Sequence, residues 1–167
     1  NNSSCAVCHT SQGFLEVAGT GGTETAGTIN DPLPQNCYTC HQIHQKYTEE
    51  DWTLTTSDPV DFWVGGTTAD IGKGNLCINC HQARVPSPGV PPVGETATYS
   101  ITNKRYGPHH GAQGMLFTGK GGYEVGTGYS NSLHTTLVEN TCINCHMASI
   151  SGSNEAGGHT FRVTSES

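Results

Sequence analysis

The feature that most constrains this chain is the arrangement of its eight cysteines. All eight fall into pairs separated by two residues, and a histidine directly follows each pair. Only nine of the 167 residues are histidine, so finding one after every pair by chance has odds of roughly 10⁻⁵. The four motifs are Cys5-Ala-Val-Cys8-His9, Cys37-Tyr-Thr-Cys40-His41, Cys77-Ile-Asn-Cys80-His81 and Cys142-Ile-Asn-Cys145-His146.

The Cys-x-x-Cys-His spacing is the attachment signature of c-type haem. Two thiols add across the two vinyl groups of one porphyrin, and the next residue places its imidazole beneath the ring as the proximal iron ligand. Zinc knuckles, disulfide scaffolds and redox-active cysteine pairs share the cysteine spacing, but they do not require the histidine every time. We therefore predict four haem c groups, bound through all eight cysteines. The predicted proximal ligands are His9, His41, His81 and His146.

The composition leaves little material for an ordinary core. Hydrophobic residues make up 33% of the chain, and 22 residues are glycine. A chain this polar buries too little apolar surface to offset the conformational entropy lost on folding, so the porphyrins must supply much of the interior. The predicted fold is a mostly irregular multihaem cytochrome c fold, with short α-helices and a few short strands around a closely packed haem array.

We expect residues 1–167 to form one domain, with a soft division at the proline-rich connector 86–92. The best helical segment spans residues 37–47. A second helix is expected to begin after Thr48, which provides an N-cap ahead of three acidic residues. Further local predictions are loops over residues 18–28 and 65–74 and a short strand over residues 96–102.

The sixth iron position decides whether a haem binds substrate or only relays electrons. Five histidines lie outside the motifs, one more than four irons need, which predicts four bis-histidine haems of low potential. The distal candidates are His44, His109, His110, His134 and His159.

Spacing constrains one of these candidates. On a helix, His44 would share a face with His41, whereas two ligands of one iron approach from opposite sides. We therefore expect His44 to serve a neighbouring haem, that of His9. His109 and His110 are adjacent, so they serve two different haems or one of them is unused. The other pairings stay open.

Three further side chains are interpreted as packing residues. Met115 is expected to pack against a haem face rather than bind iron, and Trp52 and Trp63 are expected to pack on haem or core.

The charge argues against one class of partner. Fourteen acidic residues against seven basic ones give a formal net charge of −7. Nucleic-acid binding needs a basic face, so we expect no nucleic-acid partner. The charge favours cationic or metal-bearing partners. No apolar run approaches the about 18 residues of a membrane helix, so we predict no transmembrane segment.

The chain resembles multihaem c-type cytochromes, and the four motifs extend this resemblance over its whole length. Its second half is similar to the haem-binding pattern of tetrahaem cytochrome c554 and pentahaem nitrite reductase. The corresponding lone histidines in that family are distal ligands, which implies this role for His134 and His159. The matching segments are Pro108-His109-His110-Gly111, His134 ahead of Cys142–Met147, and Gly158-His159-Thr160-Phe161.

The compact tetrahaem layout also resembles the extracellular cytochrome filaments, or nanowires, of bacteria and archaea. In those homopolymers haems stack from subunit to subunit, and a neighbouring chain can supply one distal histidine. The resemblance implies a homopolymer here, outside the cell or at its surface, because haem attachment occurs outside the cytoplasm. The fifth non-motif histidine would suit an intersubunit ligand.

The expected function is electron transfer as a subunit of such a filament, with redox proteins or extracellular metals as partners and no catalytic residues. One alternative is a soluble periplasmic electron shuttle. Another is a reductase of nitrite, hydroxylamine or a sulfur oxyanion at one open haem. The histidine surplus and the absence of a Cys-x-x-Cys-Lys motif weigh against the reductase.

Overall fold

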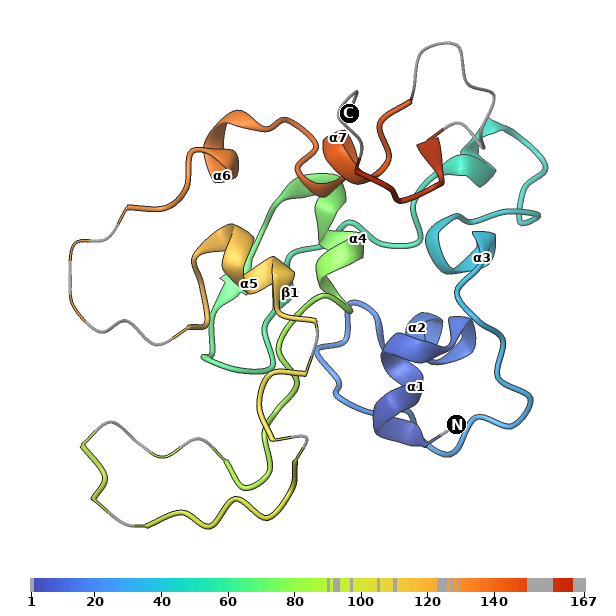
Figure 1. The fold of residues 1–167 in the computed structure, drawn as a ribbon. Coiled ribbons are helices and arrows are strands. Elements are labelled where there is room, and N and C mark those ends of the chain that lie inside the picture. Colours follow the sequence, from blue (N-terminus) through green and yellow to red (C-terminus); the bar gives the residue numbers. More distant parts are fainter. Residues whose placement is uncertain are drawn as a thin grey trace.

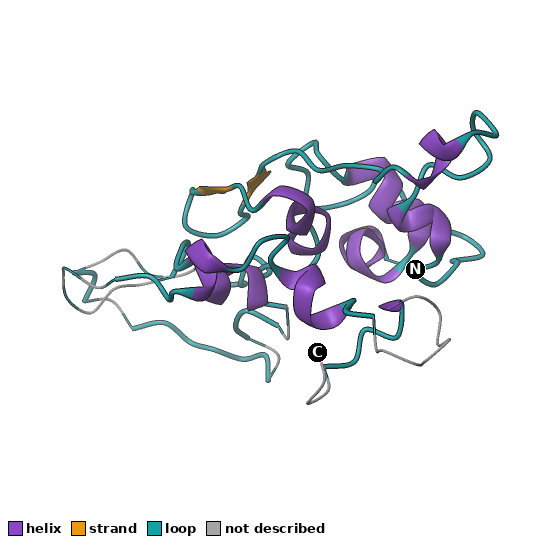
Figure 2. Ribbon diagram, turned by 90° about the horizontal axis from the view of Figure 1, so that it is seen from above, coloured by secondary structure: helices purple, strands orange, loops and turns teal. Residues whose placement is uncertain are grey.

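The computed structural model describes residues 2–89, 91, 94–96, 98–104, 106–109, 111–122, 126, 128, 130–149 and 158–163. Most of this chain is irregular, and short helices connected by loops account for its regular structure (Figures 1 and 2). The helices are α1 (Ser3–His9), α2 (Ser11–Val17), α3 (Cys37–Cys40), η1 (Glu49–Trp52), η2 (Gly72–Gly74), α4 (Asn75–Ile78), α5 (Gln113–Thr118), α6 (His134–Leu137) and α7 (Cys142–His146). The coarse fold prediction is confirmed.

A two-stranded antiparallel sheet is formed by β1 (Val60–Asp61) and β2 (Thr68–Ala69), with Val60 opposite Ala69. It lies at one edge of the molecule (Figure 2). The segment 65–74, predicted as a loop, therefore contains β2 and η2. The described residues of 96–102 form no strand, contrary to the prediction.

Each cysteine–histidine motif forms about one helical turn. The first and fourth motifs lie within α1 and α7. In the second and third, the histidine amide closes the turn by donating to the carbonyl of the first cysteine: His41 to Cys37 at 2.9 Å and His81 to Cys77 at 3.0 Å. Residues three apart share one side of a helical turn, so this geometry brings both thiols of a motif to the same side.

Asparagine caps start two of these turns. The Asn2 side chain accepts a hydrogen bond from the Ser4 amide at the start of α1. Asn36 forms a capping box with Thr39 at the start of α3. Such caps satisfy amides that have no partner within the helix, so they favour a helix start at these positions.

Thr10 connects α1 to α2. Its amide donates to the Ala6 carbonyl at the end of α1, and its hydroxyl accepts from the Gly13 amide in the first turn of α2. The Thr10 side chain is fully buried, and Phe14 and Val17 are buried nearby. The first motif is thereby held against a packed helix pair.

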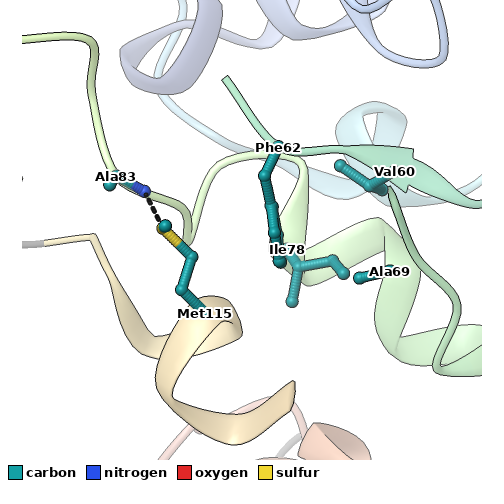
Figure 3. Packing of buried hydrophobic residues seen from close by; sticks show 6 residues of the cluster. All are labelled: Val60, Phe62, Ala69, Ile78, Ala83 and Met115. Atoms are coloured by element: carbon teal, nitrogen blue, oxygen red, sulfur yellow. Dashed lines mark hydrogen bonds between the residues drawn. The ribbon is translucent and has the colours of Figure 1, made fainter. Parts of the chain in front are cut away.

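The central hydrophobic cluster is small. Its six buried residues are Val60, Phe62, Ala69, Ile78, Ala83 and Met115, which come from the sheet, α4, α5 and the connecting chain (Figure 3). Met115 packs within this cluster, and its sulfur lies 3.2 Å from the Ala83 amide. The cluster braces the third motif, because Ile78 lies between Cys77 and Cys80.

The helix predicted over residues 37–47 is wrong beyond Cys40. His41 is extended, with φ −124°, and His44 and Tyr47 have φ values of 60° and 57°. Residues with positive φ cannot continue a right-handed helix, so the chain turns instead. The predicted cap at Thr48 is confirmed, since its side chain accepts from the Glu50 amide at the start of η1.

Candidate haem-binding centre

Three of the four motifs lie together. The sulfur of Cys8 is 3.9 Å from the Cys80 carbonyl oxygen, and the sulfur of Cys80 is 3.9 Å from the Val7 carbonyl oxygen. The thiols of Cys77 and Cys142 also interact. Accordingly, α4 lies between α7 and the α1–α2 pair in Figure 1. The third motif is thus adjacent to both the first and the fourth.

This proximity changes the acidity of the thiols. The hydrogen bond from Cys77, with a further one from Thr141, lowers the pKa of Cys142 to about 6. The same contact and burial raise the pKa of Cys77. A low thiol pKa favours the thiolate, the more reactive form of cysteine. All eight cysteines lie in the described part of the chain, and all are free thiols there.

Three motif histidines use the same ring nitrogen to contact an oxygen acceptor. Nδ1 of His41 lies 2.7 Å from the Trp52 carbonyl oxygen, and Nδ1 of His146 lies 3.4 Å from that of Phe161. Nδ1 of His81 lies 3.2 Å from Oε1 of Gln113. A carbonyl oxygen can only accept, so Nδ1 carries the proton and Nε2 keeps a lone pair for a metal. This arrangement is typical of histidines that bind metals.

Sequence analysis identified none of these acceptors. Those for His41 and His146 are backbone carbonyls, which every residue type provides, so they leave no signal in the sequence. Gln113 follows the Pro108–Gly111 segment closely, but nothing in its spacing links it to His81.

Two motif histidines each lie opposite a non-motif histidine. The ring centroids of His9 and His109 are 6.2 Å apart with an interplanar angle of 73°. Those of His41 and His159 are 6.2 Å apart at 52°. Two imidazoles on opposite sides of one metal have centroids roughly 6.2 Å apart, from metal–nitrogen bonds of about 2.0 Å and about 1.1 Å from nitrogen to centroid. Both pairs therefore have the centroid separation that two axial ligands of one iron would need.

Distance alone does not single out these pairs, because the rings of His41 and Trp52 are also 6.2 Å apart. The identity of the partners is more informative. In both pairs a histidine from a cysteine motif meets one of the five histidines predicted as distal ligands, across a long separation in sequence. That is the combination a bis-histidine haem needs.

The remaining candidates are distributed as follows. The ring of His44 contacts Tyr38 and Tyr47, with centroids 6.1 and 5.8 Å away, and His109 rather than His44 lies opposite His9. The expectation for His44 required a helix over residues 37–47, and in the structure the helix ends at Cys40. His134 begins α6, with Nδ1 3.0 Å from the Ser132 hydroxyl. His110 lies outside the described residues.

In the part of the chain that the structure describes, His81 and His146 form no ring contact with a second histidine. The described residues also contain no group of three or more His, Cys, Asp or Glu side chains that could hold a metal ion. A histidine pair is sufficient for iron when a porphyrin supplies the other four ligands.

A cavity of about 310 Å³ opens beside the first and third motifs. Its lining includes Trp63 and Tyr106, which offer flat aromatic surface, and Arg84, which offers a cation. No cysteine or histidine is among its described lining residues. Trp63 is half-buried, whereas Trp52 is 67% exposed and meets only the edge of His41.

No helix among the described residues has the length and apolar character needed to cross a membrane. A scan against protein-family models, a search of curated proteins and a search of solved structures each found no match to this chain.

Proposed function

We propose that this protein transfers electrons through four covalently attached c-type haems. The observation that carries the proposal is the pairing of motif histidines with distal candidates. His9 meets His109 and His41 meets His159 at the separation that two axial ligands require. Haem iron supplies a reversible one-electron change between its ferric and ferrous states.

The chain's own groups would hold each haem from two directions. The eight cysteines would tether the porphyrins, and the four motif histidines would each bind one iron. His109 and His159 would supply second ligands to the irons of His9 and His41. For the irons of His81 and His146, the candidate distal ligands are His44, His110 and His134.

Exposed apolar side chains support a bulky cofactor. Leu116 lies in α5, Leu137 lies in α6 and Leu133 directly precedes α6; they are 80%, 74% and 71% exposed. Each is available to pack against a cofactor, because burying a leucine contributes about 1.5–3 kcal/mol. His134 lies among these residues, so a porphyrin ligated there would cover leucines. The small central cluster supports the same interpretation.

The ligand set favours relay over catalysis. Two axial histidines fill an iron and leave no position for a substrate. The contacts of Cys8 with Cys80 and of Cys77 with Cys142 place three motifs side by side. Porphyrins attached to these motifs would lie close together, which suits transfer from one haem to the next. The chain then acts as an electron carrier rather than an enzyme.

The finer proposal is a subunit of an extracellular or cell-surface conductive homopolymer that passes electrons to redox proteins or extracellular metals. It rests on the resemblance to cytochrome filaments and on the fifth non-motif histidine. The alternative is a soluble periplasmic shuttle.

The test is expression in a host that attaches c-type haem. We expect the intact mass to include four haems and the oxidised visible spectrum to be low-spin throughout. Retention of zinc or formation of disulfides at the eight cysteines would refute the proposal, and a high-spin haem in the native protein would favour a reductase. Negative-stain microscopy then separates filaments from single particles.

A further inference from the structure

The carboxylate of Asp51 lies inside the turn formed by residues 44–47. Its Oδ1 accepts a hydrogen bond from the Lys46 amide at 2.8 Å, and its Oδ2 accepts from the Tyr47 amide at 3.1 Å. Burial opposes ionisation of this carboxyl, but hydrogen bonds from these amides and from those of His44 and Gln45 lower the pKa of Asp51. One buried side chain thus gathers four consecutive backbone amides.

The turn needs this support because of its backbone conformation. His44 and Tyr47 both adopt the left-handed region, with φ of 60° and 57°, which residues other than glycine seldom occupy. In this conformation the Lys46 and Tyr47 amides both donate to Asp51. Without the carboxylate, the four donors would lose a common acceptor, and the turn could relax toward more favourable dihedrals.

The conformation of the turn sets the direction of the His44 ring. That ring lies between Tyr38, inside the second motif, and Tyr47, at the end of the turn. His44 is exposed rather than packed into the core. His41, the ligand of its own motif, is already paired with His159. The turn therefore presents an imidazole that the second haem does not need.

We propose that Asp51 is a positioning residue that orients His44 as a distal ligand for the iron of a neighbouring motif. This inference rests on the proposed haem function. Among the described residues, His81 and His146 are the motif histidines with no ring contact to a second histidine, so their irons are the ones that would need another imidazole. The carboxylate does not touch the ligand ring and acts through the backbone of the turn.

Three variants test the proposal in the protein with haem attached. His44→Ala removes the ligand, and Asp51→Asn replaces an acceptor with an amide group that faces amide donors. Glu50→Gln is the matched control, because Glu50 carries the same charge next in sequence but its carboxylate contacts the exposed Lys46 side chain, at 2.6 Å, rather than the amides of the turn. Haem number is measured by mass, and spin state by visible and electron paramagnetic resonance spectra.

We expect four haems in every variant. His44→Ala should convert one of the four from low-spin to high-spin, Asp51→Asn should convert part of the same haem, and Glu50→Gln should convert none. Added imidazole should restore the low-spin spectrum in both affected variants. The double variant His44→Ala/Asp51→Asn should show no more high-spin haem than His44→Ala alone, because both changes affect the same ligand.

Two results overturn the inference while leaving the haem function intact: four low-spin haems in His44→Ala, or a low-spin spectrum in Asp51→Asn beside a high-spin haem in His44→Ala. If Asp51→Asn yields no folded protein, Asp51→Glu replaces it. Asp51→Glu keeps the charge and should give a high-spin fraction smaller than that of His44→Ala. A spectrum identical to that of the wild-type protein overturns the inference. A wild-type protein without haem refutes the function itself.

Discussion

Replacing His109 tests the axial pairing directly. Half of the 6.2 Å centroid separation between His9 and His109 is 3.1 Å, and subtracting the about 1.1 Å from centroid to nitrogen leaves about 2.0 Å, a metal–imidazole bond length. An alanine methyl at position 109 stops far short of that midpoint. We therefore expect His109→Ala to leave the iron of His9 with one protein ligand, and a weak ligand such as water to enter.

The size of the effect follows from the ligand count. One haem in four should become high-spin, so about a quarter of the low-spin signal should be lost. His159→Ala should remove a second quarter, and the double variant about half. His109→Met should instead keep that haem low-spin and raise its potential by on the order of 0.1 V, within the about 0.8 V that axial-ligand identity spans.

Electron paramagnetic resonance with a redox titration measures both quantities. His44→Ala is the informative comparison, because spacing alone assigned His44 to the haem of His9. If His109→Ala keeps four low-spin haems and the His9 haem becomes high-spin in His44→Ala, the pairing in the structure is refuted and the spacing argument stands.

Three further predictions concern the surroundings of the third motif. Gln113→Leu removes the acceptor that orients His81, so cyanide should displace a ligand at that haem about 10-fold more readily, as measured by spectral titration; an unchanged titration would contradict this role. Asn75→Ala removes hydrogen bonds to the Ile71 amide, the Ser57 carbonyl and Asp70 at 2.8, 2.9 and 2.9 Å, and guanidinium unfolding should show a loss of about 3 kcal/mol, against about 1 kcal/mol for Asn79→Ala, which loses one hydrogen bond. The Asn75 side chain, then the Gly72 amide and the charge of Lys120, lower the pKa of Asp70. Its contribution to stability is therefore complete above the ordinary carboxyl pKa of about 3.9 and is lost as the pH falls through the lower folded value; Asp70→Asn should flatten acid unfolding in this range, and an unchanged acid midpoint would argue against it.

Local features of this fold could be predicted from the sequence. The cap at Thr48 was predicted from a hydroxyl followed by three acidic residues. In the structure the Thr48 side chain caps η1, and the three acidic residues lie in its first turn. Met115, which the sequence predicts to pack against a haem face, is 8% exposed and packs in the central cluster of the protein itself. Such signals need only neighbouring residues.

The pairing of histidines could not be predicted in this way. His9 meets His109, and His41 meets His159, through the path of the whole chain, which no local spacing encodes. The helix expected over residues 37–47 failed for a related reason. The residues of this segment are compatible with a helix. However, Asp51, four residues beyond the end of the segment, accepts hydrogen bonds from the amides of residues 44–47 and stabilises a turn instead.

The acceptors of the Nδ1 protons differ in how substitution can affect them. His41 and His146 donate to main-chain oxygens of Trp52 and Phe161, so exchanging either of those side chains leaves the acceptor in place. His81 donates to the side chain of Gln113, which a single codon change can remove or convert to a carboxylate. Within this trio, an iron bound by His81, as proposed, would be the one whose potential evolution or protein engineering could adjust without moving the backbone.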